Sequence, residues 1–521
     1  MKEIKGYIAR FAVAAVLIVT PIYYENGYYN TLVAKAHVVW AIAGVTLAAF
    51  LIVTLVQTVR APQQLADEWR SFRGSFGLMD AAVAAFGITA LVSSFLSENM
   101  YAAFTGIRGW RMGGITLALL AVLYFLVSRY AGKDHYLWVY VAIAATVEYV
   151  LGFLNGLDID PLGLHTNLVS SEHFEYISTV GNINSYSGYL ALTLPLLTMV
   201  WITEKRTWLR VWVGLLLVVG FTNPYMNNSD GAWLGICFAM LFVIYYSLKD
   251  RAKYDRLLQA GLLFAISGLL VQFGIHFLTD NHVEFGGISA AMLNYHLYLL
   301  IGAFCLLMLL LKKPLEKITN ARTDRGMAIT FGVLAVLAVA AVVLYNASIF
   351  EGSWGTKRGW IWMLSMQLFA EGSIKDKLVG IGPDCFGILM MDRFGDFISE
   401  HWGKRVANAH NEYIQYLVTM GLAGAVSYLG MYVSAWRRYV KRIHWSESKA
   451  VCFVAIMGYA GQALVNNPQA MNMAILFVCM GLFRSPDAEC APGAISAEKT
   501  EQLKHKPPGD EGEGCQSKNL S

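Results

Sequence analysis

The chain has 521 residues, of which 56% are hydrophobic and only 15% are charged. Soluble globular proteins average about 25% charged residues, so this composition excludes a soluble enzyme and a disordered chain. The seven cysteines follow no paired spacing, which excludes a disulfide scaffold. The net charge of +4 is small, and the hydrophobic residues are gathered in long blocks. We therefore expect an integral membrane protein that crosses the bilayer many times.

A membrane-spanning helix needs about 20 mostly apolar residues. About 14 stretches fit this requirement, namely residues 7–24, 35–58, 77–96, 112–130, 135–154, 184–203, 208–222, 231–248, 257–278, 292–311, 327–346, 408–436, 449–465 and 470–483. The fold class expected is all-α and polytopic, with about 12–14 transmembrane helices. Residues 1–484 are expected to form one membrane domain. Residues 485–521 are polar and rich in Gly, Pro, Glu and Lys, which predicts a disordered tail.

Basic residues crowd alternate connections between the predicted spans. By the positive-inside rule that side is cytoplasmic, and both termini are expected there in a multi-pass protein of the cell membrane. The opposite side holds a long connection, residues 347–407, with a helical-looking stretch at 356–371. Connections of this length usually carry function. The sequence therefore predicts an extracytoplasmic functional site.

The predicted outer side holds five arginines, although the topology rule expects few there, and three of them are candidate binding residues. Arg108 and Arg111 lie in Gly-Ile-Arg-Gly-Trp-Arg-Met-Gly, and Arg358 lies in Trp-Gly-Thr-Lys-Arg-Gly-Trp. The planar guanidinium can hold a diphosphate or a carboxylate with two parallel hydrogen bonds. The alternative is that these side chains reach toward lipid headgroups at the interface.

A histidine lies at the predicted start of a membrane span, at the outer face. Asn408 is a plausible N-cap, which would place His410 in the first turn, where the helix dipole favours a neutral imidazole. A neutral imidazole can accept a proton from a hydroxyl. Asn411 and Gln415 are four residues apart on one helical face and are predicted to bind sugar hydroxyls. The alternative for His410 is a polar cap at the membrane interface.

Glu148 is the clearest charge inside a predicted span. Such groups are functional candidates, and two roles stay open for Glu148: pairing with Arg108 or Arg111, or direct binding of an acceptor. No cluster of carboxylates, histidines or cysteines has the spacing of metal ligands, so neither a metal nor another cofactor is expected.

Three stretches between about Gly181 and Tyr432 resemble the bacterial O-antigen ligase and O-antigen polymerase family. The first is Gly181-Asn-Ile-Asn-Ser-Tyr-Ser-Gly, which contains Asn184 and is similar to the family's Gly-Asn-x-Asn entry into an apolar helix. The second is Arg358 with Trp362, followed by Leu378-Val-Gly-Ile-Gly-Pro-Asp-Cys-Phe. The third and most specific is Ala409-His-Asn-Glu-Tyr-Ile-Gln-Tyr-Leu, followed by Met420-Gly-Leu-Ala-Gly.

The resemblance implies an α-helical, GT-C-like glycosyltransferase of cell-envelope polysaccharide synthesis. The donor it implies is a glycan on undecaprenyl diphosphate, and the acceptor is a hydroxyl of a glycan, lipid or protein. By the same resemblance His410 is the catalytic base, Arg358 contacts the diphosphate, and Arg108 or Arg111 is a second contact. One position departs from the family, because Asp230 stands where its members often have arginine.

Two other functions are compatible with a polytopic chain. A flippase for lipid-linked oligosaccharides is expected to carry ionisable residues near the middle of the membrane and paired broken helices. A non-catalytic scaffold would leave the histidine and the outer arginines unexplained. The polar residues here lie at the outer edge, which favours the transferase. Ligase and polymerase stay open, membrane lipids are the expected surroundings, and no nucleic-acid partner is expected.

Overall fold

Long apolar helices make up most of the chain in this computed structural model. The structure describes residues 1–485 apart from 29, 108, 133–135, 167, 249, 279–284, most of 313–345, 403–404 and 442–445. Ten helices in this part are long and apolar enough to cross a membrane. They are α1 (Lys2–Ile22), α2 (Thr31–Arg60), α4 (Leu78–Phe95), α6 (Gly114–Leu126) continued by the π-helix η1 (Val127–Ala131), α7 (Leu137–Gly156), α8 (Ile183–Thr203), α9 (Thr207–Gly220) continued by α10 (Asn223–Met226), α11 (Asp230–Ser247), α12 (Arg251–Leu278) and α20 (Glu412–Lys441). The all-α polytopic architecture expected from the hydropathy pattern is therefore present.

The predicted block 292–311 is bent rather than straight. It forms α13 (Gly287–Asn294) and α14 (Leu297–Leu310), which meet at 61° and bring the possible spans to 11 in the described part of the chain. The bend falls where His296 adopts a left-handed conformation, with φ 50°. A left-handed residue cannot continue an α-helix, so the block breaks there.

Two further predicted spans are helices of 16 and 15 residues, α21 (Glu447–Gln462) and α22 (Ala470–Arg484). Both are shorter than the about 20 residues that a straight crossing needs. The predicted span 327–346 and the predicted tail beyond Ser485 lie mostly or wholly outside the described residues. These differences account for the smaller number of spans than the hydropathy blocks suggest.

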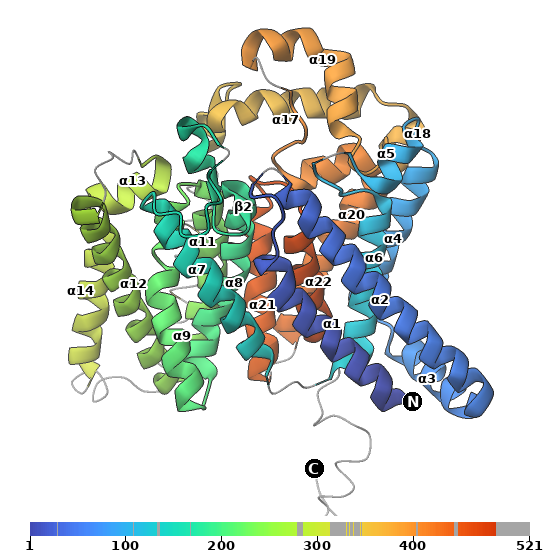
Figure 1. Cartoon of the computed structure of the whole chain (residues 1–521), viewed down its shortest axis with the longest axis horizontal. Coiled ribbons are helices and arrows are strands. Elements are labelled where there is room, and N and C mark those ends of the chain that lie inside the picture. The colour runs from blue at the N-terminus through green and yellow to red at the C-terminus, as the bar shows by residue number, and fades with distance from the viewer. Residues whose placement is uncertain are drawn as a thin grey trace, which may run out of the picture. The chain divides into compact units, whose positions relative to one another are not determined.

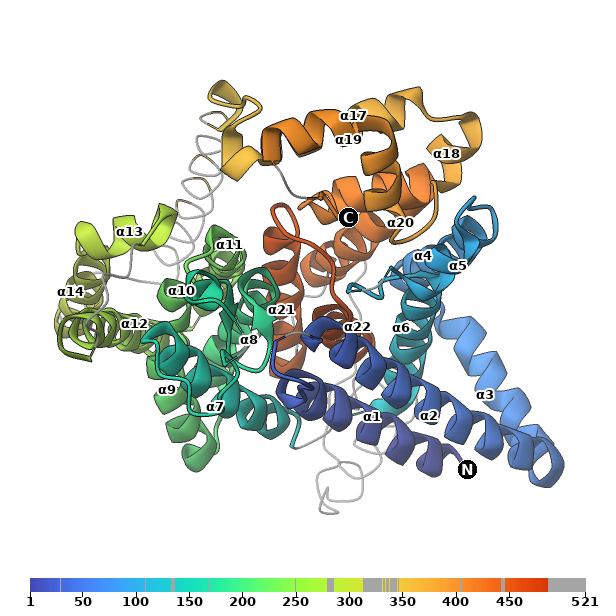
Figure 2. The same ribbon diagram turned by 45° about the horizontal axis from the view of Figure 1, so that its top comes forward.

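Shorter elements gather at one end of the helices, which we call the loop face (Figure 1). It carries α5 (Met100–Thr105), the 3-10 helix η2 (Ser170–Glu175), the antiparallel pair β1 (Tyr176–Ile177) and β2 (Gly181–Asn182), α17 (Trp354–Glu371), α18 (Ile374–Val379) and α19 (Phe386–Trp402). The helix predicted at 356–371 is confirmed by α17. Helix α3 (Pro62–Ser75) lies at the other end, near the start of α1. Figure 2 shows α17 and α19 lying against the start of α20, with which both are in contact.

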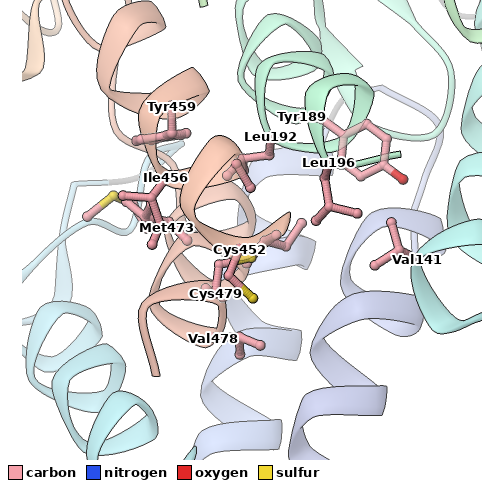
Figure 3. Packing of buried hydrophobic residues seen from close by; sticks show 14 of the residues in the cluster. Val141, Tyr189, Leu192, Leu196, Cys452, Ile456, Tyr459, Met473, Val478 and Cys479 are labelled. Atoms are coloured by element: carbon pink, nitrogen blue, oxygen red, sulfur yellow. The ribbon is translucent and has the colours of Figure 1, made fainter. Parts of the chain in front are cut away.

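The centre of the fold is α8, which is buried along almost its whole length. Leu192 and Leu196 of α8 pack against Cys452 and Ile456 of α21 and against α22 (Figure 3). The backbones of α8 and α21 touch, because a Cβ added to Gly458 would lie 2.1 Å from the carbonyl oxygen of Ala191. Small residues allow such close packing of membrane helices. This packing places the α21–α22 connection beside the start of α8.

Candidate functional site

His410 lies just outside the start of α20. The helix begins at Glu412, and Asn411 is its cap, because the Oδ1 of Asn411 accepts a hydrogen bond from the backbone N–H of Ile414 at 3.1 Å. The prediction that Asn408 caps the helix and that His410 occupies its first turn is therefore wrong. Two asparagines compete for the cap, and the second one has the N3 amide in reach. His410 instead has a left-handed backbone, with φ 47°.

The segment before α20 is held by side chains from two helices. The Oε1 of Gln415 accepts a hydrogen bond from the N–H of Ala409 at 2.8 Å, and the indole N–H of Trp362 donates to the carbonyl of Ala409 at 3.0 Å. Asn411 and Gln415 were expected to bind sugar hydroxyls. Their carbonyl oxygens are occupied by backbone amides, and both residues are buried. We therefore infer that Asn411 and Gln415 position His410 rather than contact a sugar.

Burial and the nearby positive charge of Arg358 together lower the pKa of His410 to about 4. The imidazole is therefore neutral near pH 7. The neutral state was expected from the helix dipole, but its physical causes are desolvation and Arg358, because His410 stands before the helix. Arg358, early in α17, is half-buried and makes no hydrogen bond or ion pair with any described residue. The site thus combines a neutral base with an arginine that no described residue binds directly.

Asp230 is the carboxylate that faces Arg358. Burial lowers the pKa of Arg358, and the charge of Asp230 opposes this shift. The Oδ1 of Asp230 also accepts a hydrogen bond from the N–H of Ile288 at 2.9 Å, at the start of α13. The Oδ1 of Asn228 accepts from the N–H of Gly286 at 2.9 Å. The residue that departs from the family pattern therefore ties α11 to α13 and partly offsets the charge of Arg358.

Asn467, in the connection between α21 and α22, touches the imidazole of His410. Its Nδ2 lies 3.3 Å from Nδ1 of His410, and its Oδ1 is buried without a partner among the described residues. The connection is fixed to α8, because Nδ2 of Asn466 donates to the carbonyl of Asn184 at 2.7 Å. Turning the Asn467 amide presents Oδ1 to an Nδ1–H group. Nε2 is then free to accept a proton.

His410 and Asn467 line a pocket of about 470 Å³ at the loop face. This volume is within the usual range for small-molecule sites, about 300–1,000 Å³. The other lining residues are Tyr28, Asn30, Thr31, Leu32, Val33, Gly109, Trp110, Tyr176, Asn182 and Asn184. Asn184, a predicted binding residue, is thus brought together with His410. None of the described lining residues carries a full charge, since His410 is neutral.

Asp384 holds the loop that carries two of the pocket residues. Its Oδ2 accepts hydrogen bonds from the N–H groups of Ile107 at 2.8 Å and Met112 at 3.1 Å. Gly109 and Trp110, between these two amides, reach the pocket. Arg111 acts electrostatically on Asp384 but is not among the lining residues. Arg108, the other predicted contact in this loop, lies outside the described residues.

The pH dependence of stability tests this attachment. Burial raises the pKa of Asp384 from 3.8 to about 7, although the two amides and Arg111 lower it. The folded state therefore holds the proton more tightly, and this stabilisation is complete below about pH 4 and lost as the pH rises through about 7. Asp384→Asn keeps an acceptor for the amides and should remove this dependence. Asp384→Ala leaves two amides unpaired and should cost about 1–3 kcal/mol for each. Thermal unfolding of the solubilised protein between pH 4 and 8 measures both effects, and an unchanged pH dependence in Asp384→Asn would refute the assignment.

Glu148 does not reach the pocket. It is fully buried, and its two carboxylate oxygens accept hydrogen bonds from the hydroxyls of Ser178 and Thr179. The nearby cation is Lys35, whose Nζ also donates to the carbonyl oxygens at the end of α1. Among the described residues, Glu148 therefore attaches the β1–β2 turn to the helices, rather than pairing with Arg111 or lining the pocket, while the predicted partner Arg108 lies outside those residues. The sequence prediction missed Lys35 because it lies on a different helix.

The sequence also did not single out Asn467, Trp110, Tyr176 and Asp384. A usable signal for the first was the polar run Asn-Asn-Pro-Gln between two apolar blocks on the predicted outer side. Among the described residues, no group of three or more His, Cys, Asp or Glu side chains is placed to hold a metal ion. A comparison with protein-family models finds no match to this chain, and a comparison with curated protein sequences finds none either.

Proposed function

We propose that the chain transfers a glycan from a lipid diphosphate to an acceptor hydroxyl, with His410 as the general base and Arg358 as the diphosphate contact. The observation that carries this proposal is the pairing of a neutral, half-buried imidazole at a polar pocket with a half-buried arginine that no described residue binds directly. A base and an anion site side by side are what transfer from a diphosphate requires. The motif resemblance to O-antigen ligases and polymerases supports the same reaction.

The proposed step balances as a single displacement. The unprotonated imidazole nitrogen of His410 takes the proton of the acceptor hydroxyl while the oxygen attacks the anomeric carbon of the donor. The bond between that carbon and the diphosphate oxygen breaks, and the lipid diphosphate leaves with the electron pair. Arg358 stabilises the charge that develops on the leaving oxygen. The proton then passes from His410 to the diphosphate or to water.

Donor binding should also raise the pKa of His410. In the empty site the positive charge of Arg358 helps to lower the pKa of His410. A diphosphate bound to Arg358 offsets that charge and adds negative charge nearby, which raises the pKa of His410 and makes it a stronger base. Asp230 already offsets part of the charge of Arg358, so the diphosphate must compete with this carboxylate. The proposed order is therefore donor first and proton transfer second.

We place the loop face outside the cytoplasm, because the basic connections of the sequence lie at the opposite end. The proposed donor is then a glycan on undecaprenyl diphosphate, and the acceptor is a glycan, a lipid or a protein. A polymerase would extend another lipid-linked glycan, and a ligase would use a separate acceptor.

Asn467 is proposed as a positioning residue for His410. Asn467→Ala removes the hydrogen bond to Nδ1 and should lower kcat about 10-fold, the worth of one positioning hydrogen bond. Asn467→Asp should instead fix the Nδ1–H tautomer and raise the pKa of His410 through its charge. The acid limb of the pH–rate profile should then move to higher pH in the aspartate variant alone. Wild-type kcat and wild-type acid limbs in both variants would remove this role.

The function is tested with purified protein in detergent and a lipid-diphosphate-linked glycan. A flippase shows no chemical turnover in micelles, whereas a transferase releases free lipid diphosphate. Release with longer lipid-linked chains indicates a polymerase, and release only with an added acceptor indicates a ligase. Absence of release with every acceptor, together with movement of the same lipid across vesicles, would replace the transferase by the flippase.

A further inference from the structure

The pocket beside His410 is lined by four asparagines from three separate segments, since Asn182 and Asn184 both lie at the start of α8. Asn30 precedes α2, Asn182 ends β2, Asn184 lies in the first turn of α8, and Asn467 precedes α22. The side-chain amides of Asn30 and Asn184 make no hydrogen bond with any described residue. The Asn467 side chain is only 3% exposed, and one of its two amide atoms is left without a partner among the described residues: Oδ1 as placed, or Nδ2 once the amide is turned toward His410. A buried polar atom without a partner costs free energy of folding, so these amides favour the binding of a ligand that hydrogen-bonds to them.

Aromatic side chains form another part of the lining. The rings of Tyr28 and Tyr176 stack with centroids 5.1 Å apart and an interplanar angle of 28°. Trp110 comes from the loop that Asp384 holds. Each amide offers both a donor and an acceptor, as a sugar hydroxyl does. The apolar faces of aromatic rings suit the C–H face of a sugar ring. The combination of amides and aromatic rings is therefore complementary to a sugar.

The charges divide the site into two parts. None of the described lining residues of the pocket is charged, whereas Arg358 acts on His410 but is not among those residues. An anionic group finds no cation among the described pocket residues and is attracted by Arg358. The base must reach the hydroxyl that loses its proton, and His410 lines the pocket.

We infer that this amide-lined pocket is the acceptor subsite and that it takes an uncharged sugar unit, whose reacting hydroxyl it presents to His410. The inference rests on the proposed function and assigns the two substrates to two parts of the site. The pocket holds the neutral acceptor sugar, and Arg358 holds the donor diphosphate. Selection against charged sugars follows, because a carboxylate would lose its hydration without gaining a cation.

Steady-state kinetics test the assignment. Asn30→Ala and Asn184→Ala remove amides that make no hydrogen bond to any described residue, so both variants should fold. Each should raise the KM for the acceptor about 3- to 10-fold, the worth of one or two hydrogen bonds. The KM for the donor should stay at the wild-type value. Asn99→Ala is the matched control, since Asn99 is exposed at the loop face and lines a different cavity. A raised donor KM with an unchanged acceptor KM would assign the pocket to the donor instead.

Binding without catalysis separates this inference from the proposed function. Saturation-transfer NMR on the full chain in nanodiscs would use the methyl glycosides of glucose, galactose and N-acetylglucosamine, with methyl glucuronide as the charged probe. We expect contact with one or more neutral glycosides, weaker contact with the glucuronide, and loss of contact in Asn184→Ala but not in Asn99→Ala. This pattern without any transfer activity would keep the pocket and remove the enzyme. Equal contact in wild type and Asn184→Ala, or preference for the glucuronide, would overturn the inference.

Discussion

Replacing His410 is expected to lower the transfer rate about 10²- to 10⁴-fold, the usual contribution of a general base. His410→Asn is the better variant, because asparagine tolerates the left-handed backbone that His410 adopts, whereas alanine there is strained. The fold should persist, since the imidazole is neutral and its one side-chain hydrogen bond to the described residues is with Asn467. The rate is measured as release of free lipid diphosphate at saturating donor and acceptor.

The control for this experiment is His401→Ala. His401 is an exposed histidine on α19 at the same face and does not line the pocket. This variant should keep the wild-type rate. If His410→Asn also kept the wild-type rate with the same thermal unfolding midpoint, His410 would not be the base.

Replacing Arg358 is expected to impair donor use about 10- to 100-fold in kcat/KM, because charge-assisted hydrogen bonds to the diphosphate are lost. Both Arg358→Gln and Arg358→Lys should lower kcat/KM for the donor, since lysine cannot form two parallel hydrogen bonds to the diphosphate. The KM for the acceptor should change little, because Arg358 is not among the residues of the amide-lined pocket. Arg393→Gln is the matched control, an exposed arginine that lines a separate cavity at the same face.

The pH dependence of activity tests the same Arg358 variants in a second way. The base works when unprotonated, so activity falls as the pH drops through the pKa of His410, which burial and Arg358 set at about 4. Arg358→Gln removes the positive charge, so the acid limb of the free enzyme should move to higher pH. Arg358→Lys keeps a positive charge and should keep the acid limb nearer to wild type. Equal acid limbs in wild type and Arg358→Gln would show that Arg358 does not act on His410.

Hydropathy predicted the helices well, because a span is a property of about 20 successive residues. The predicted blocks 184–203 and 77–96 match α8 (Ile183–Thr203) and α4 (Leu78–Phe95) to within one residue at each end. The bend at His296 was missed, since neither glycine nor proline marks the left-handed residue there.

The site was predicted only where one residue carries its own chemical signal. His410, Arg358 and Asn184 were named from motifs, and the structure places His410 with Asn184 in the pocket and with Arg358 electrostatically. The contact between Asn467 and His410 spans 57 residues of sequence. Likewise, Lys35, the cation that acts electrostatically on Glu148, lies on α2, whereas Glu148 lies on α7. Such partners follow from packing of α2, α7, α8 and α21, which no local pattern reveals.

The measurement that tests the central claim most directly is a single-turnover experiment with enzyme in excess over a lipid-diphosphate-linked glycan. Free lipid diphosphate and new glycosidic bonds are counted together in wild type and in His410→Asn. The account predicts one lipid diphosphate released for each new bond in wild type, and a rate at least about 100-fold lower in the variant. Release without a new bond, or the same rate in both proteins, would contradict glycosyl transfer at His410.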